Sequence, residues 1–161
     1  MPLKMNKNGL RTGTVNGYKI GPKADLRGAK LAGCNLIKAD LSEANLTDAN
    51  LSGANLQEAK LMGADLTSAD LSHAGLEKAD LFQANLFDTD LTSANLLLAD
   101  FMSADLTSAK IGPDTFLQGA DFTDATVDSR HVPLIEAAQR EALASLKVNG
   151  GRASNPRRPR R

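Results

Sequence analysis

Two histidines and one cysteine are the side chains of this sequence best suited to act as base and nucleophile in catalysis. They are His73, His131 and Cys34, and they lie far apart in the 161-residue chain. Carboxylates are plentiful, but no cleft is indicated that would shift their pKa values for acid–base work. Since a nucleophile, a base and an orienting group do not converge, we expect no enzyme activity. We also expect no cofactor or metal, because a glycine-rich phosphate loop and a metal-spaced Cys or His cluster are both missing.

The secondary structure around these side chains can be predicted from a leucine that returns at every fifth residue. In the segment ADLSEANLTDANLSGANL the leucines are Leu41, Leu46, Leu51 and Leu56. Five helical steps of about 100° would scatter them around the axis, and in a continuous strand they would alternate between faces. Within one unit, Ala-Asp-Leu reads as a three-residue strand with Ala and Leu on one face. If the next two residues turn the chain by about 90°, four units close a square with Leu and Ala inside.

Twenty residues then make one coil, and successive coils stack at about 4.8 Å, the spacing of paired strands. The central residues of the units, here called centres, run without a break from Leu26 to Ile111. The residue two before each centre is Ala except at Cys34 and Thr89. Cys34 is most simply a buried substitute for Ala, and a reactive thiol is the alternative. The two-residue corners are rich in Ser, Thr, Asp and Glu, which suit turns that face water.

Two stretches break the spacing of five. The tetrapeptide KIGP occurs at residues 19–22 and 110–113, and after each the next centre comes six residues on. Glycine gives backbone freedom and proline fixes φ, so we expect a one-residue bulge in a corner at both places. Upstream, Leu10, Val15 and Ile20 keep the spacing of five, which predicts a degenerate first coil within the basic segment 1–23.

These Ala-(Asp/Asn)-Leu-x-x units resemble the repeat of the pentapeptide-repeat proteins over residues 24–127, about two thirds of the chain. The resemblance implies an all-β solenoid, a right-handed quadrilateral parallel β-helix, which would here have about five coils. It implies no substrate. In such a fold Leu41, Leu61, Leu81 and Phe101 stack on one inner side, with Phe101 as the only ring in that column.

The segment 128–149 changes in composition and predicts a helix over residues 133–147. Ile135, Ala138, Ala142 and Leu146 form one apolar stripe, with proline near the start and glycine after the end. We expect the helix to cap the open strand edge of the last coil, because uncovered edges aggregate. Docking of the helix on a partner is the alternative.

Residues 150–161, GGRASNPRRPRR, have the composition of a disordered basic tail. Such a tail serves solubility, or it contacts a polyanion such as nucleic acid or anionic lipid. The candidate polyanion contacts are Arg157, Arg158, Arg160 and Arg161.

The formal net charge of zero conceals a segregation of charge. Residues 1–23 carry five basic groups and no acidic one, residues 24–127 carry a net charge of −10, and the tail adds +5. Some pentapeptide-repeat proteins are acidic rods that imitate DNA and bind type II topoisomerases, so the resemblance implies gyrase modulation as an alternative function. Lys30, Lys60 and Lys110 interrupt the acidic columns, which disfavours this alternative.

A column of apolar side chains is the most particular surface feature that the spacing yields. Met62, Phe82 and Met102 directly follow their centres at intervals of twenty residues, so they should stack on the outside. Single exposed apolar residues are ordinary, but a stacked patch favours an interface. We therefore predict a non-enzymatic interaction scaffold that binds an unidentified protein or a second copy of itself. The candidate interface residues are Met62, Phe82, Phe87, Leu97, Leu98 and Met102.

The sequence contains no apolar run of signal-peptide or membrane-span length. A single cysteine also excludes an intramolecular disulfide framework. We therefore expect a cytoplasmic protein without a membrane span.

Overall fold

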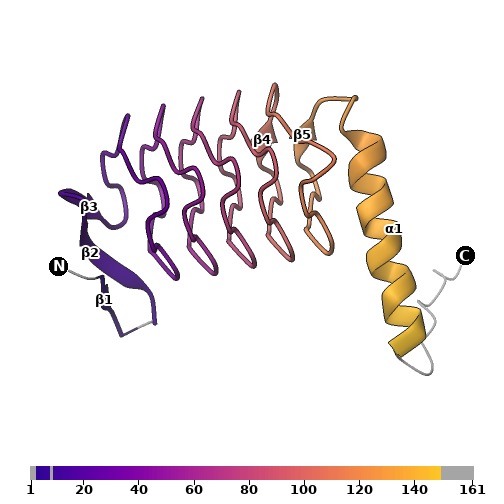
Figure 1. Cartoon of the computed structure of the whole chain (residues 1–161), viewed down its shortest axis with the longest axis horizontal. Helices are drawn as coiled ribbons and strands as arrows, with labels where there is room; N and C mark the ends of the chain where they lie inside the picture. Colours follow the sequence, from indigo (N-terminus) through magenta and orange to yellow (C-terminus); the bar gives the residue numbers. More distant parts are fainter. Residues whose placement is uncertain (1–2, 8, 150–161) are drawn as a thin grey trace, which may run out of the picture.

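The chain forms a stack of four-sided coils with a small β-sheet at one end and a helix at the other (Figure 1). This computed structural model describes residues 3–7 and 9–149, and it describes side-chain surroundings up to Arg140. Between the terminal elements the coils pair mostly through single-residue bridges, because each side of the square is only a few residues long. The elements are β1 (Lys4–Met5), β2 (Arg11–Val15), β3 (Tyr18–Ile20), β4 (Asp105–Leu106), β5 (Thr126–Val127) and α1 (Val132–Asn149).

Successive coils pair in parallel with a register of twenty residues. On one side Asp25 bridges Asn45, Asn45 bridges Asp65, and Asp65 bridges Asn85, and the other three sides repeat this pattern. The N–H of each centre donates to a carbonyl one coil further on, as from Leu26 N to Asn45 O at 2.7 Å. The observed coil therefore has four sides of five residues each, as the spacing of five in the sequence predicts.

Each corner from Leu26 to Ala109 is a β-turn whose third residue has a positive φ. In the corner after Leu41, Ala44 N donates to Leu41 O at 3.0 Å, and Glu43 has a φ of 56°. A left-handed conformation is unfavourable for residues other than glycine, so the turn needs support. The outward side chain before the centre supplies it, because Asp40 Oδ1 accepts hydrogen bonds from Ser42 N at 3.3 Å and Ser42 Oγ at 2.9 Å.

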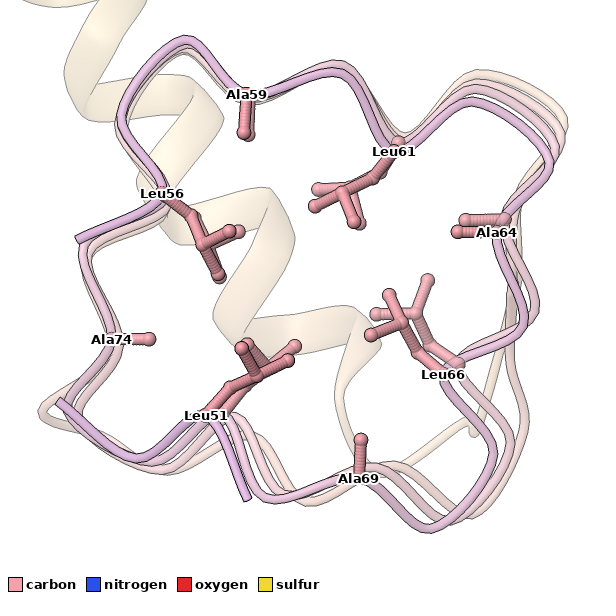
Figure 2. Packing of buried hydrophobic residues seen from close by; sticks show 14 of the residues in the cluster. Leu51, Leu56, Ala59, Leu61, Ala64, Leu66, Ala69 and Ala74 are labelled. Carbon is pink, nitrogen blue, oxygen red and sulfur yellow. The ribbon is translucent and has the colours of Figure 1, made fainter. Parts of the chain in front are cut away.

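The interior of the coils is filled by leucine and alanine. Figure 2 shows leucines from the four sides of the square pointing inward, with an alanine between each pair. The leucine centres expose 1% of their surface or less from Leu26 to Leu106. At an alanine position, the buried Thr89 donates its Oγ1 to Leu66 O at 2.8 Å, so this interior hydroxyl is satisfied.

The inner column of Phe101 holds a second ring, which corrects the prediction of a single one. Phe122 stacks on Phe101 with ring centroids 5.0 Å apart and an interplanar angle of 2°. The expected bulge at residues 110–113 lengthens the register to twenty-one residues, as in the bridge between Asp100 and Asp121. This shift places Phe122 above Phe101.

The prediction of a degenerate first coil is wrong for residues 4–20. Strand β1 pairs antiparallel with β2, and β2 pairs antiparallel with β3. Asn16 and Gly17 connect β2 and β3 with φ values of 50° and 84°, as the two-residue Asn-Gly hairpin turn requires. Arg11 alone continues the parallel stacking, since it bridges Ala39. The turn chemistry therefore overrides the spacing of five.

Helix α1 lies across the end of the last coil. Ile135 and Ala138 are buried there, and the His131 Nε2–H donates to Ala109 O at 2.9 Å, which joins the helix start to the coil. Figure 2 shows the helix passing behind the square and leaving its outline at the corner between Leu56 and Ala59. The remaining stripe residues, Ala142 and Leu146, lie beyond the side chains that the structure describes.

Candidate functional site

The column Met62–Phe82–Met102, here called the apolar ridge, occupies one corner on three consecutive coils. Gly63 N donates to Phe82 O at 2.9 Å, and Gln83 N donates to Met102 O at 3.0 Å, so the three backbones are stacked. The side chain of Met62 is 40% exposed, while those of Phe82 and Met102 are half-buried. In Figure 2 this corner lies between Leu61 and Ala64.

The other three candidate interface residues lie on the two adjacent corners. Phe87 is 44% exposed on the next corner, and Leu98 is 50% exposed on the preceding corner beside the half-buried Leu97. Leu98 lies against Gly119, where an added Cβ would meet Leu98 Cδ2 at 2.6 Å. The structure thus unites only the ridge residues in a single column, and it places Phe87, Leu97 and Leu98 around it.

Between the ridge and the Leu97–Leu98 corner lies a side of the solenoid with stacked carboxylates. Its outward residues bridge in the order Asp40, Lys60, Asp80, Asp100 and Asp121. We call the last three the upper acidic face, because no other residue type interrupts them.

Each carboxylate of the upper acidic face supports its own corner. Asp80 Oδ1 accepts Phe82 N at 3.2 Å, and Asp100 Oδ1 accepts Met102 N at 2.9 Å. For Asp121, hydrogen bonds from the hydroxyl and the backbone N–H of Thr123 hold the carboxyl pKa below its usual value. The same residues therefore carry negative charge outward and shape the ridge beside them.

The carboxylates on two other sides have closer partners. Asp90 lies 3.5 Å from Lys110 Nζ, and Asp25 lies 2.8 Å from Arg27 Nη2. Asp65 accepts a hydrogen bond from Asn85 Nδ2 at 3.3 Å. The upper acidic face is thus a column of three consecutive carboxylates without an ion pair in the described part of the chain.

Cys34 is half-buried, which corrects the prediction of a fully buried position. Its Sγ accepts a hydrogen bond from Asn16 Nδ2 at 3.2 Å. The hairpin that replaces the expected coil covers this end incompletely and leaves a pocket of about 430 Å³ beside the thiol. The pocket is lined by Leu3, Arg11, Thr14, Val15, Asn16, Cys34 and Asn35.

The two histidines are not brought together. His131 is buried under the helix, whereas His73 is exposed on a corner beside a hollow of about 570 Å³ that Asp114 and Phe116 also line. Phe116 is 58% exposed, and sequence reasoning missed it. Its position directly before the shifted centre Leu117 is an outward one, which was the available signal.

Residues 3–7 and 9–149 contain neither a metal-binding cluster nor a membrane-crossing helix. This part of the chain holds no group of three or more His, Cys, Asp or Glu side chains placed to bind a metal ion. It also contains no helix with the length and hydropathy needed to cross a membrane. The candidate polyanion contacts Arg157, Arg158, Arg160 and Arg161 lie outside the described residues.

Comparison with known proteins identifies the repeat. The family model for pentapeptide repeats matches residues 24–61, 44–83 and 84–112. A search of curated proteins gave no match. Among solved structures, a pentapeptide repeat protein from the thylakoid lumen of Arabidopsis thaliana is 32% identical, with a TM-score of 0.64 over 68% of this chain and 76% of that chain.

Two cyanobacterial pentapeptide repeat proteins also match. The one from Cyanothece is 34% identical, with a TM-score of 0.45 over 57% of this chain and 58% of its own. The one from Nostoc is 34% identical, with a TM-score of 0.41 over 55% of this chain and 64% of its own. With the family model matching more than half of its residues and the four-sided coil in its structure, this chain belongs to the pentapeptide repeat family, whose fold is the right-handed quadrilateral β-helix.

Proposed function

We propose that this protein is a non-catalytic interaction scaffold that binds a protein through its apolar ridge. The observation that carries the proposal is the stacking of Met62, Phe82 and Met102 on one corner. The same column continues with Ser42 below and Thr123 above, so the apolar part is confined to three coils. Apolar side chains gathered in one column form a patch, and such patches mark contact surfaces.

The dimensions of the ridge suit the centre of a small interface. Three coils at about 4.8 Å give a ridge about 10 Å long, and a few such side chains carry most of the energy of many interfaces. Hydrogen bonds to the coils on both sides hold the backbone of Phe82 in place. Binding there would therefore lose little backbone freedom, which favours affinity.

A second copy of the chain is the simplest partner, because identical ridges can pair about a two-fold axis. We expect Phe82→Asp to abolish such pairing, since it places a charge at the centre of the contact. The half-buried outward site should tolerate the change, with the melting temperature lowered by no more than a few degrees. Sedimentation velocity and thermal unfolding measure the two effects.

The matched control is Thr92→Asp, which adds the same charge at the first residue of the diagonally opposite corner. It should sediment like the parent protein. A parent that is monomeric, or a Phe82→Asp variant that still associates, rejects pairing through the ridge. A melting temperature lowered far below the parent would show that Phe82 is part of the core instead.

Imitation of DNA to modulate a type II topoisomerase is the less supported alternative. Most outward carboxylates act as hydrogen-bond acceptors in their own corners, a structural role that any Asp or Asn can fill. Lys60 and Lys110 also interrupt two of the acidic columns, and Asp90 is paired with Lys110. A DNA mimic needs a more continuous charge pattern.

The cytoplasmic location expected from the sequence stays a prediction. The Arabidopsis relative is a thylakoid-lumen protein. A cytoplasmic location for this chain would therefore differ from the location of that relative. Fractionation of the native host with an antibody to this protein would test the location.

A further inference from the structure

Asp80, Asp100 and Asp121 of the upper acidic face make no ion pair within the described part of the chain, although Lys60 lies one coil from Asp80, and residues 150–161 carry five arginines. We propose that the tail, residues 150–161, binds across this face on the solenoid of its own chain. The contact pairs tail arginines with Asp80, Asp100 and Asp121, and it rests on the apolar corners at both borders of the face. The proposal goes beyond the scaffold function and does not depend on it.

The first support is the arrangement of the carboxylates. Asp80, Asp100 and Asp121 lie on consecutive coils, which stack at about 4.8 Å. Each uses Oδ1 to cap its corner, and Oδ2 makes no hydrogen bond or ion pair within the described part of the chain. Like charges at this spacing repel one another, so a bound cationic group relieves the face. On two other sides, Asp25 and Asp90 have this relief from Arg27 and Lys110.

The second support is the apolar border, which selects arginine over a simple cation. Phe82 and Met102 lie along one edge of the face, and Leu97 and Leu98 lie along the other. An arginine side chain fits both environments, because its guanidinium binds carboxylates in a fork and its aliphatic stem packs on apolar groups. The tail carries five arginines and no acidic residue.

The third support is the position where the tail begins. Helix α1 ends at Asn149, and it leaves the outline of the square at the corner between Leu56 and Ala59 (Figure 2). That corner carries Leu97 and Leu98 in a later coil, and it borders the acidic face. In Figure 1 the end of α1 likewise lies beyond one edge of the coils.

The length of the tail is sufficient. Its twelve residues span up to about 40 Å when extended, and five coils measure roughly 24 Å. The extended tail is therefore longer than the stack of coils is tall. Because tail and face share one chain, their effective concentration is in the millimolar range, and weak individual contacts suffice for binding.

The test uses full-length variants in which the charge is removed and the fold is kept. Asparagine can accept the same corner hydrogen bond as aspartate, as Asn45 and Asn85 already do in this protein. The test variant is D80N/D100N/D121N. The control is D65N/D70N/D105N, which removes the same net charge from two other sides.

A nitroxide attached to the tail reports its position. The label is placed by Ser154→Cys in a Cys34→Ala background, since Ala is the usual residue at that repeat position. We expect strong paramagnetic broadening of the amides of residues 80–82 and 100–102. The broadening should persist in the control variant, and it should be lost in the test variant and at 0.5 M NaCl. Uniform broadening on all four sides, or equal loss in both variants, overturns the proposal.

Two further measurements identify the occupant. In the first, isotope-labelled protein without nitroxide is mixed with spin-labelled protein of natural isotope content. The isotope-labelled protein should show no broadening. Broadening in this mixture would assign the face to the tail of a second copy and overturn binding within one chain.

The second measurement is DNA binding. A 20-bp DNA duplex should bind the test variant at least three-fold more tightly than the control at low salt, because the tail is released. Equal affinity of the two variants for DNA contradicts the proposal.

Discussion

At the scale of single residues, the outward aspartates are first of all turn caps. Asp121 shows this clearly, since Thr123 donates its hydroxyl at 2.6 Å and its backbone N–H at 2.9 Å to Oδ1. Both bonds favour the ionised form and lower the pKa of Asp121. The stabilisation is therefore fully present above the unfolded pKa of about 4, and it is lost as the pH falls through the lowered folded pKa.

Replacing the donor tests this account. We expect Thr123→Val to raise the pKa of Asp121 toward its ordinary value, because the hydroxyl bond is the larger cause of the shift. The pKa is measured by NMR titration of the side-chain carboxyl. Thr107→Val, which removes the same kind of bond from Asp105, should leave Asp121 unchanged. An unaltered pKa in Thr123→Val would rule the hydroxyl out as the cause.

A single inward position tests the core. Leu66 has no exposed surface, and its side chain points into the interior with the other inward leucines (Figure 2). We expect Leu66→Asp to unfold the protein at room temperature, because an unpaired buried charge costs several kcal/mol. Circular dichroism and urea titration measure the loss, with the outward Asp65→Asn as the control. A folded Leu66→Asp protein would contradict the inward register.

At the scale of elements, the helix and the sheet close the two ends of the solenoid differently. Helix α1 buries Ile135 and Ala138 against the last coil, whereas β1–β3 leave a pocket beside the first one. Covering a strand edge prevents pairing with other chains. The helix is therefore expected to protect the protein from aggregation as well as to stabilise it.

Ile135→Asp tests the role of the helix. We expect a loss of about 2 kcal/mol in the free energy of unfolding, because a buried apolar side chain is replaced by a charge. Aggregation should also increase as the edge is exposed, as measured by light scattering. Gln139→Asp adds the same charge at an exposed position of α1 and should change neither property. Equal stability of both variants would mean that the helix does not cover the coil.

At the scale of the whole molecule, charge is separated along the chain. Residues 24–127 carry a net charge of −10, and the segments at both ends supply positive charge. Over roughly 24 Å of coils this approaches the charge density of duplex DNA, which has one charge per about 1.7 Å. The interrupting lysines and the capping role of the aspartates nevertheless argue against imitation of DNA.

Supercoiling by purified DNA gyrase distinguishes the two accounts. We expect no inhibition by this protein at low salt when it is present in several-fold excess over the enzyme. Potent inhibition that disappears as salt is raised would instead favour DNA imitation, because such binding is electrostatic. D65N/D70N/D105N is the control that shows whether any inhibition follows net charge.

The leucine period of five is enough to predict the coil, because four sides of five residues place every leucine inside one square. Leu26 to Ile111 keep that period without interruption, so the inward side chains, the stacking register and the ridge positions all follow from counting. The helix over residues 133–147 was equally readable from its apolar stripe and flanking proline. These features are local, and local features are encoded by neighbouring residues.

The closure of the two ends and the ion pairs on the surface could not be predicted from the repeat and became evident in the folded chain. The Asn16–Gly17 turn folds β2 onto β3 and exposes Cys34, although Val15 and Ile20 keep the spacing of five. Lys60 and Lys110 each lie one coil from an aspartate, but within the described part of the chain only Lys110 forms an ion pair with its neighbour, Asp90. The end closure and the ion pairs depend on contacts between residues that are far apart in the sequence. The sequence of a single repeat does not show which of the competing contacts is more stable.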